Sequence, residues 1–158
     1  MRFSEAWLRE WVNPAVDTAT LADQLSMAGL EVDALMPAAP AFKGVSIGLV
    51  RTVEAHPNAA KLRVCQVDLG RGETLQIICG APNVAIGQRV PVATLGAVLP
   101  GDLKIKRAKL RGIESQGMIC SAAELGLAET SDGILALPED APIGDDFRTW
   151  LDLDDTCI

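Results

Sequence analysis

Aromatic side chains are scarce in this sequence of 158 residues and are absent from its middle. There is no Tyr, and none of the three Phe and three Trp lies between residues 43 and 146. Small β-barrels that bind single-stranded nucleic acid usually stack bases on aromatic rings. Such a stacking platform is therefore excluded for the middle of the chain. Trp7 and Trp11 are expected in the core of the outer part.

Long uncharged apolar runs are also missing. Although 49% of the residues are hydrophobic, a charge or a Pro interrupts every run well before the ~18 residues that a membrane span needs. The N-terminal stretch MRFSEAWLREW has no apolar segment followed by a small-residue cleavage site. We therefore expect a cytoplasmic protein without a membrane partner.

Histidine and paired cysteines are too few for a metal centre or a catalytic triad. The single histidine, His56, precedes Pro57 in an expected turn, and no nucleophile motif accompanies it. The four cysteines form no CxxC pair, so a zinc site and a metal cofactor are not predicted. We expect buried free thiols instead. These cysteines are Cys65, Cys79, Cys120 and Cys157.

Charge is unevenly distributed along the chain. Residues 43–120 contain eleven Lys and Arg against five Asp and Glu, a net charge of +6, whereas the remainder carries −13. The local field decides where a polyanion can dock, so the overall charge of −7 does not exclude a nucleic-acid partner. The acidic C-terminal stretch is expected to form a solvated surface.

The first 40 residues have the pattern of a small α+β unit. Ser4 can cap a short helix, and Thr20 with Asp23 resembles the start of a second. Gly29 fits the end of that second helix. Residues 30–35 alternate like a half-buried strand, and a Pro-rich linker over 37–44 follows.

From residue 45 the pattern changes to short strands separated by turns, which predicts a mainly β fold, either a small barrel or a sandwich. A helix is expected over 121–127, with Ser121 and Glu124 as its capping box. The candidate strands are 45–55, 62–69, 74–79, 89–95, 103–111 and 117–120.

Near its end the chain returns to an alternating pattern, which predicts a strand beginning at Trp150. A strand with nothing after it needs a partner elsewhere, so we expect residues 148–158 to pair with the first 40. The expected domains are a small α+β domain in two parts, 1–40 and 148–158, with 41–147 inserted between them. The small domain is expected to be incomplete, as part of a longer protein. A natural end at residue 158 is the alternative.

The strongest chemical signal is the segment 103–111, in which five of the fourteen cationic residues fall within eight positions. Leu103 and Ile105, and after a change of phase Ala108 and Leu110, are expected to face inward, with the cations outward. The phase changes near Lys106 and Arg107, which predicts a bulge or barrel corner there. A curved strand would then present a row of cations at a spacing that can follow phosphates. A solvated strand face is the alternative. The cations are Lys104, Lys106, Arg107, Lys109 and Arg111.

Ordered sequence blocks over residues 43–128 resemble the tRNA-binding OB-fold domain family. Residues 7–10, 29–32 and 134–154 are also similar to the N-terminal region of bacterial phenylalanyl-tRNA synthetase β subunits. One departure is Ala60, which stands where the family usually has Asp beside Lys61. The blocks are HPNAAKL at 56–62, LQIICGAPN at 75–83, VPVA at 90–93, KLRG at 109–112, SQGMICS at 115–121 and ELGL at 124–127.

This resemblance implies a five-stranded OB-fold barrel inserted into the small α+β domain, and a tRNA-binding module without a catalytic site of its own. The parent synthetase uses ATP and Mg²⁺ to attach phenylalanine to tRNA and pairs with an α subunit. We expect tRNA, not DNA, as the nucleic-acid partner. A free-standing homodimeric tRNA-binding or chaperone-like protein and a subunit-docking scaffold are the alternatives. Besides the five cations, the candidate RNA contacts are Lys61, Asn83, Ser115, Gln116 and Met118.

Overall fold

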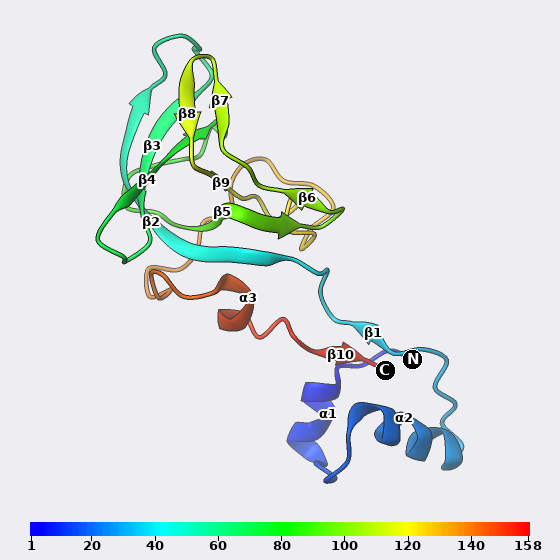
Figure 1. Ribbon diagram of the computed structural model, residues 1–158. Helices are drawn as coiled ribbons and strands as arrows, with labels where there is room; N and C mark the ends of the chain where they lie inside the picture. Colours follow the sequence, from blue (N-terminus) through cyan, green and yellow to red (C-terminus); the bar gives the residue numbers. More distant parts are fainter. The chain divides into compact units, whose positions relative to one another are not determined.

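The computed structural model describes residues 1–158, which form two compact units. One unit combines residues 1–39 with residues 152–158, and the other is the continuous stretch 40–151. Figure 1 shows both units, coloured along the sequence. None of the helices has the length and apolar character needed to cross a bilayer.

The discontinuous unit contains two helices and a short pair of strands. The helices are α1 (Glu5–Trp11) and α2 (Thr18–Met27), and the antiparallel strands are β1 (Met36–Pro37) and β10 (Thr156–Cys157). Ser4 caps α1 as expected, since its hydroxyl accepts a hydrogen bond from the Trp7 N–H. The predicted start of α2 is wrong, because Asp17 caps this helix through the Thr20 N–H.

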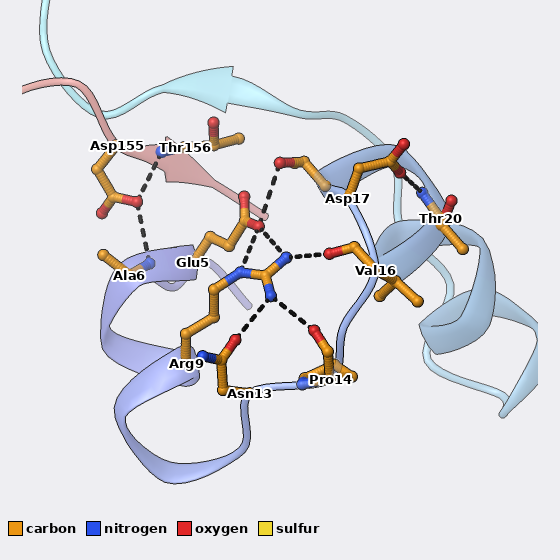
Figure 2. Close-up of polar contacts among 11 residues, drawn as sticks. Glu5, Ala6, Arg9, Asn13, Pro14, Val16, Asp17, Thr20, Asp155 and Thr156 are labelled. Carbon is orange, nitrogen blue, oxygen red and sulfur yellow. Dashed lines mark hydrogen bonds and ion pairs between the residues drawn. The ribbon is translucent and has the colours of Figure 1, made fainter.

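Arg9 connects α1 to the segment that leads into α2 (Figure 2). Its guanidinium donates to the carboxylate of Glu5 at 2.8 Å and to the carbonyl oxygens of Pro14 and Val16 at 3.1 and 2.8 Å. Glu5 is buried and accepts a further bond from the Thr18 hydroxyl. Burial of the carboxylate is therefore compensated by this network.

Two predictions for this unit are wrong. Residues 30–35 form no strand, because the C-terminal segment pairs instead with β1 and, through Cys157 and Ile158, with Phe3 and Ser4. Trp7 and Trp11 are not core residues, since they are 58% and 77% exposed. The face of α1 that packs inside the unit carries Glu5, so the two indoles, one helical turn apart, lie away from it.

The unit 40–151 is a curled antiparallel sheet with a separate hairpin (Figure 1). The sheet order is β4-β3-β2-β5-β6, with β9 also paired to β5, and β7 pairs with β8. The mainly β prediction is confirmed, as are five of the six candidate strand positions. The strands are β2 (Lys43–Ala55), β3 (Arg63–Asp68), β4 (Thr74–Cys79), β5 (Arg89–Leu99), β6 (Leu103–Lys104), β7 (Ala108–Leu110), β8 (Ile113–Ser115) and β9 (Gly117–Ile119).

The sheet curls around β2, which pairs with β5 through its first half and with β3 through its second. Irregularities in register interrupt both ladders, and such bulges bend a strand. Gly48 lies where the layers come close, because a Cβ there would be 2.7 Å from Val67 and 2.8 Å from Val92. A side chain at Gly48 would therefore force the curled sheet apart.

The interior of the curl is filled by small β-branched and sulfur-containing side chains. Val50, Cys65, Val67, Ile77 and Val92 are all fully buried. These residues come from four strands, which explains why alternating positions of short strands form one core. The aromatic residues lie outside this core, as the composition predicted.

The segment predicted as a strand from Trp150 is instead the end of helix α3 (Phe147–Trp150). Asp146 caps this helix by accepting a hydrogen bond from the Thr149 N–H at 2.9 Å. Phe147 is fully buried, and its ring centroid lies 6.3 Å from that of Phe42 and 6.2 Å from that of Trp150. The cap and the buried ring together favour the helical turn over an extended strand.

The predicted helix over 121–127 is also wrong, although its capping box forms. The carboxylate of Glu124 accepts from the Ser121 N–H at 2.7 Å, and the Glu124 N–H donates to the Ser121 hydroxyl at 3.2 Å. The segment nevertheless consists of turns. A single capped turn is too short to propagate a helix.

The four cysteines are free thiols, as predicted, and all but Cys157 are buried. Burial raises the pKa of Cys65 from 9.0 to about 11 and that of Cys120 to about 12, and it also raises the pKa of Cys79. Below pH 9 both folded and unfolded thiols are protonated. Above it, the unfolded chain loses protons first, so stability falls as pH rises toward 11.

We therefore expect one rapidly labelled cysteine in the native protein. At pH 8 a thiol reagent should modify Cys157 quickly and the three buried thiols only as fast as the unit 40–151 opens. Mass spectrometry of quenched samples counts the adducts. Fast addition of two or more labels to the folded chain would contradict this description of the core.

Candidate nucleic-acid interface

The five cations of segment 103–111 lie on two different strands and the link between them. The predicted break near Lys106 and Arg107 is confirmed, because β6 ends at Lys104 and β7 begins at Ala108. One continuous curved strand is therefore wrong. β6 pairs with β5, whereas β7 pairs only with β8.

The expected burial pattern of this segment is also largely wrong. Ile105 is buried and is held by backbone hydrogen bonds of 2.8 Å to Gly96 and Ala97. Leu103, Ala108 and Leu110, which were expected to face inward, are exposed. Ala108 and Leu110 lie on β7, which pairs only with β8, and Leu103 lies on β6 at the edge of the sheet.

All five cations are exposed and four have no ion-pair partner. The exception is Arg107, whose Nε lies 3.6 Å from a carboxylate oxygen of Glu114, with both side chains well exposed. Exposed pairs of this kind contribute little and exchange easily with another anion. The cations are therefore available to an external polyanion.

Ser115 and Gln116, which were candidate RNA contacts, attach the base of the β7–β8 hairpin to β4. The buried Ser115 hydroxyl accepts from the Ile78 N–H at 3.1 Å and donates to the Gly117 carbonyl at 2.9 Å. Gln116 exchanges two bonds with the backbone of Gln76, through its own N–H and its side-chain oxygen. These bonds join the end of β8 to β4, two strands that do not pair with each other in a ladder.

The remaining three candidates lie in different surroundings. Asn83 bonds both the N–H and the carbonyl of Ile134, at 3.0 and 2.9 Å, so its amide holds two loops together. Met118 is half-buried in β9, next to Ala93 of β5 in the ladder. Lys61 is exposed in the loop between β2 and β3, following Ala60.

A groove of about 740 Å³ runs beside the cationic segment. Lys104, Lys106 and Arg107 line it, and its apolar lining includes Met118 and Cys79. Glu124 and Asp132 also line this groove. The groove can thus accept an anionic chain along the cations, while no aromatic ring is present to stack on a base.

Two residues outside the candidate list, His56 and Asn58, contact the turn of the β7–β8 hairpin. His56 Nε2 lies 3.0 Å from the Leu110 carbonyl, and the Asn58 amide donates to the Arg111 carbonyl at 3.0 Å. From the sequence alone, His56 is considered only as a possible metal ligand or catalytic group. The signal that could have found this contact is the presence of both blocks, HPNAAKL and KLRG, in one family pattern.

Residues 45–146 match the family described as "Putative tRNA binding domain". This match spans the curled sheet except the first two residues of β2, and includes the cationic segment and the hairpin. The chain belongs to the tRNA-binding domain family.

More particularly, the whole chain is similar to the N-terminal region of phenylalanine–tRNA ligase beta subunits. It is 61% identical over 158 residues to that of Acinetobacter baylyi and 60% identical to that of Pseudoalteromonas translucida. Both matches cover 100% of this chain and 20% of the relative, so the chain spans about a fifth of the length of these relatives.

Among solved structures, the chain is similar to the MetRS related protein from Pyrococcus horikoshii. The sequences are 27% identical and the TM-score is 0.48. The match covers 65% of this chain and 86% of the other.

Proposed function

We propose that residues 41–147 bind tRNA and position it for a phenylalanine–tRNA ligase, as an inserted, non-catalytic domain of the β subunit. Binding is electrostatic. Lys104, Lys106, Arg107, Lys109 and Arg111 neutralise phosphates of the RNA backbone, and polar groups of the groove contact exposed base edges. The domain thus recognises the backbone and shape of the RNA, because it has no aromatic surface for stacking.

The observation that carries this proposal is the exposed, mostly unpaired state of the five cations, three of which line the groove. A solvated strand face would also be exposed. However, Lys106 and Arg107 lie on the link between β6 and β7, and Lys109 and Arg111 lie on a hairpin that pairs with no strand of the main sheet. Lys61 is a further candidate phosphate contact because it is exposed in the β2–β3 loop beside this hairpin.

The activity of the longer protein is part of the same proposal. The relatives' name implies ligation of phenylalanine to tRNA, and we propose ATP and Mg²⁺ as co-reactants, an α subunit as partner and the cytoplasm as location. We assign none of the residues of this chain to ATP, Mg²⁺ or the α subunit. Their role is to hold tRNA.

Identity of 58–61% to the β subunits over the whole chain favours this reading over a free-standing homodimeric tRNA-binding protein. A protein of that second kind needs no equivalent of residues 1–40. A scaffold that docks another subunit without touching RNA is the other alternative, and binding experiments distinguish it.

A two-site variant tests the proposal with the full chain. Lys106→Ala with Lys109→Ala is expected to weaken binding of unmodified phenylalanine tRNA about tenfold at low salt and to reduce the salt slope by about 2. The matched control is Arg2→Ala with Arg71→Ala, which removes the same charge from exposed positions outside the cationic segment and the groove. Equal weakening by the two variants would mean that only net charge matters. No measurable binding by the unmodified chain would favour the scaffold.

A further inference from the structure

The β7–β8 hairpin, which carries Lys109 and Arg111, receives little support from the hydrophobic core. All three residues of β7 are exposed, and β7 has no strand neighbour except β8. Ser115 and Gln116 attach the base of the hairpin to β4. The position of its tip must therefore come from other contacts.

Those contacts come from the loop between β2 and β3, which lies beside the hairpin in Figure 1. His56 is 5% exposed, and its Nδ1 accepts a hydrogen bond of 3.0 Å from the Asn58 N–H. The ring proton is consequently on Nε2, which donates to the Leu110 carbonyl at 3.0 Å. The Asn58 side chain donates to the next carbonyl, that of Arg111, at 3.0 Å.

The two carbonyls belong to a turn with an unusual backbone. Leu110 and Ile113 face each other in the ladder, and the two residues between them, Arg111 and Gly112, have φ values of +51° and +91°. Two consecutive left-handed residues are typical of the tight turn that matches the twist of a hairpin. At Arg111, a residue with a Cβ, this conformation needs support from its surroundings.

We propose that His56 and Asn58 are positioning residues for tRNA binding: they fix the tip of the β7–β8 hairpin so that Lys109 and Arg111 face the RNA backbone together. This inference rests on the proposed function. His56 and Asn58 touch no RNA and act through the two carbonyls. Their contribution to affinity therefore exists only while Lys109 and Arg111 are present.

A double-mutant cycle on the full chain tests this dependence. Asn58→Ala is expected to weaken binding of unmodified phenylalanine tRNA about fivefold in the native sequence, but less than twofold in a background with Lys109→Ala and Arg111→Ala. His56→Ala is expected to behave in the same way. His56→Gln is expected to recover most of the affinity, because its amide can donate to the Leu110 carbonyl.

Gln88→Ala is the matched control for a general loss of order. Gln88 also makes two bonds to loop backbone in this unit, to Ala85 and Asn83, but does not contact the hairpin. Its replacement is expected to leave tRNA affinity within twofold of the native value. If Asn58→Ala weakens binding equally in both backgrounds, or not at all, the positioning role is wrong. If removal of Lys109 and Arg111 itself changes nothing, the proposed function fails instead.

Discussion

Replacing Phe147 with Ala is expected to lower the free energy of unfolding of the unit 40–151 by about 3–5 kcal/mol. Phe147 is fully buried and is the central ring of a cluster with Phe42 and Trp150. It also secures the return of the chain to the sheet, where the Ile47 N–H donates to the Asp145 carbonyl at 2.9 Å. Ala would leave a cavity beside β2 that this short helix cannot fill.

Residue-resolved amide hydrogen exchange measures this loss within β2 and β5. Trp11→Ala is the control, because Trp11 is also a large aromatic residue but is mostly exposed on α1. The control is expected to change the exchange free energies of β2 and β5 by less than about 0.5 kcal/mol. If Phe147→Ala also left them within that limit, the aromatic cluster would not support the sheet.

Arg9→Ala is expected to destabilise the unit formed by residues 1–39 and 152–158 by about 3 kcal/mol. The substitution leaves the buried Glu5 carboxylate with a single hydroxyl donor, Thr18, and removes the donors to the Pro14 and Val16 carbonyls. Lys at position 9 should recover less than half of the loss, because a single ammonium cannot reach all of these acceptors.

Exchange protection of the α1 and α2 amides reports this effect. The matched control is Arg2→Ala, since Arg2 is exposed in the same unit and its one hydrogen bond, 3.7 Å long, is to the Met36 sulfur. Arg2→Ala is expected to leave α1 and α2 protected. Equal loss of protection in both variants would show that the Arg9 network does not hold the helices together.

The strands of the curled sheet were predictable because their sequence carries the physical cause of the structure. Alternating apolar residues such as Cys65 and Val67 point into the core, and Gly or Pro separates most of the strands. The phase change near Lys106 likewise marked the true end of a strand. Local pattern sufficed wherever burial on one face decided the conformation.

Prediction failed where contacts distant in sequence decide the outcome. The burial of Ser115 depends on Ile78 of another strand, and the helical turn at Phe147 depends on Phe42. Apolar Leu110 was expected inside, but it belongs to a hairpin without a covering layer. None of these relations has a signature within a short window of sequence.

The candidate site shows the same division. The cations and their exposure followed from composition and spacing. The roles of Ser115, Gln116 and His56 in holding the hairpin did not, because each depends on a hydrogen bond to a strand or turn about 40 or more residues away. Both kinds of residue occur in the sequence blocks typical of the family.

The central claim is that the five cations of segment 103–111 bind the phosphates of tRNA. The dependence of tRNA affinity on salt concentration tests this claim most directly. Five phosphate contacts predict a log–log slope of about −4, so binding should weaken by roughly 250-fold when salt rises fourfold. In a chain with Ala at Lys104, Lys106, Arg107, Lys109 and Arg111, the slope should lose most of its magnitude. Equal slopes for the two chains would contradict the account and place the RNA elsewhere on the surface.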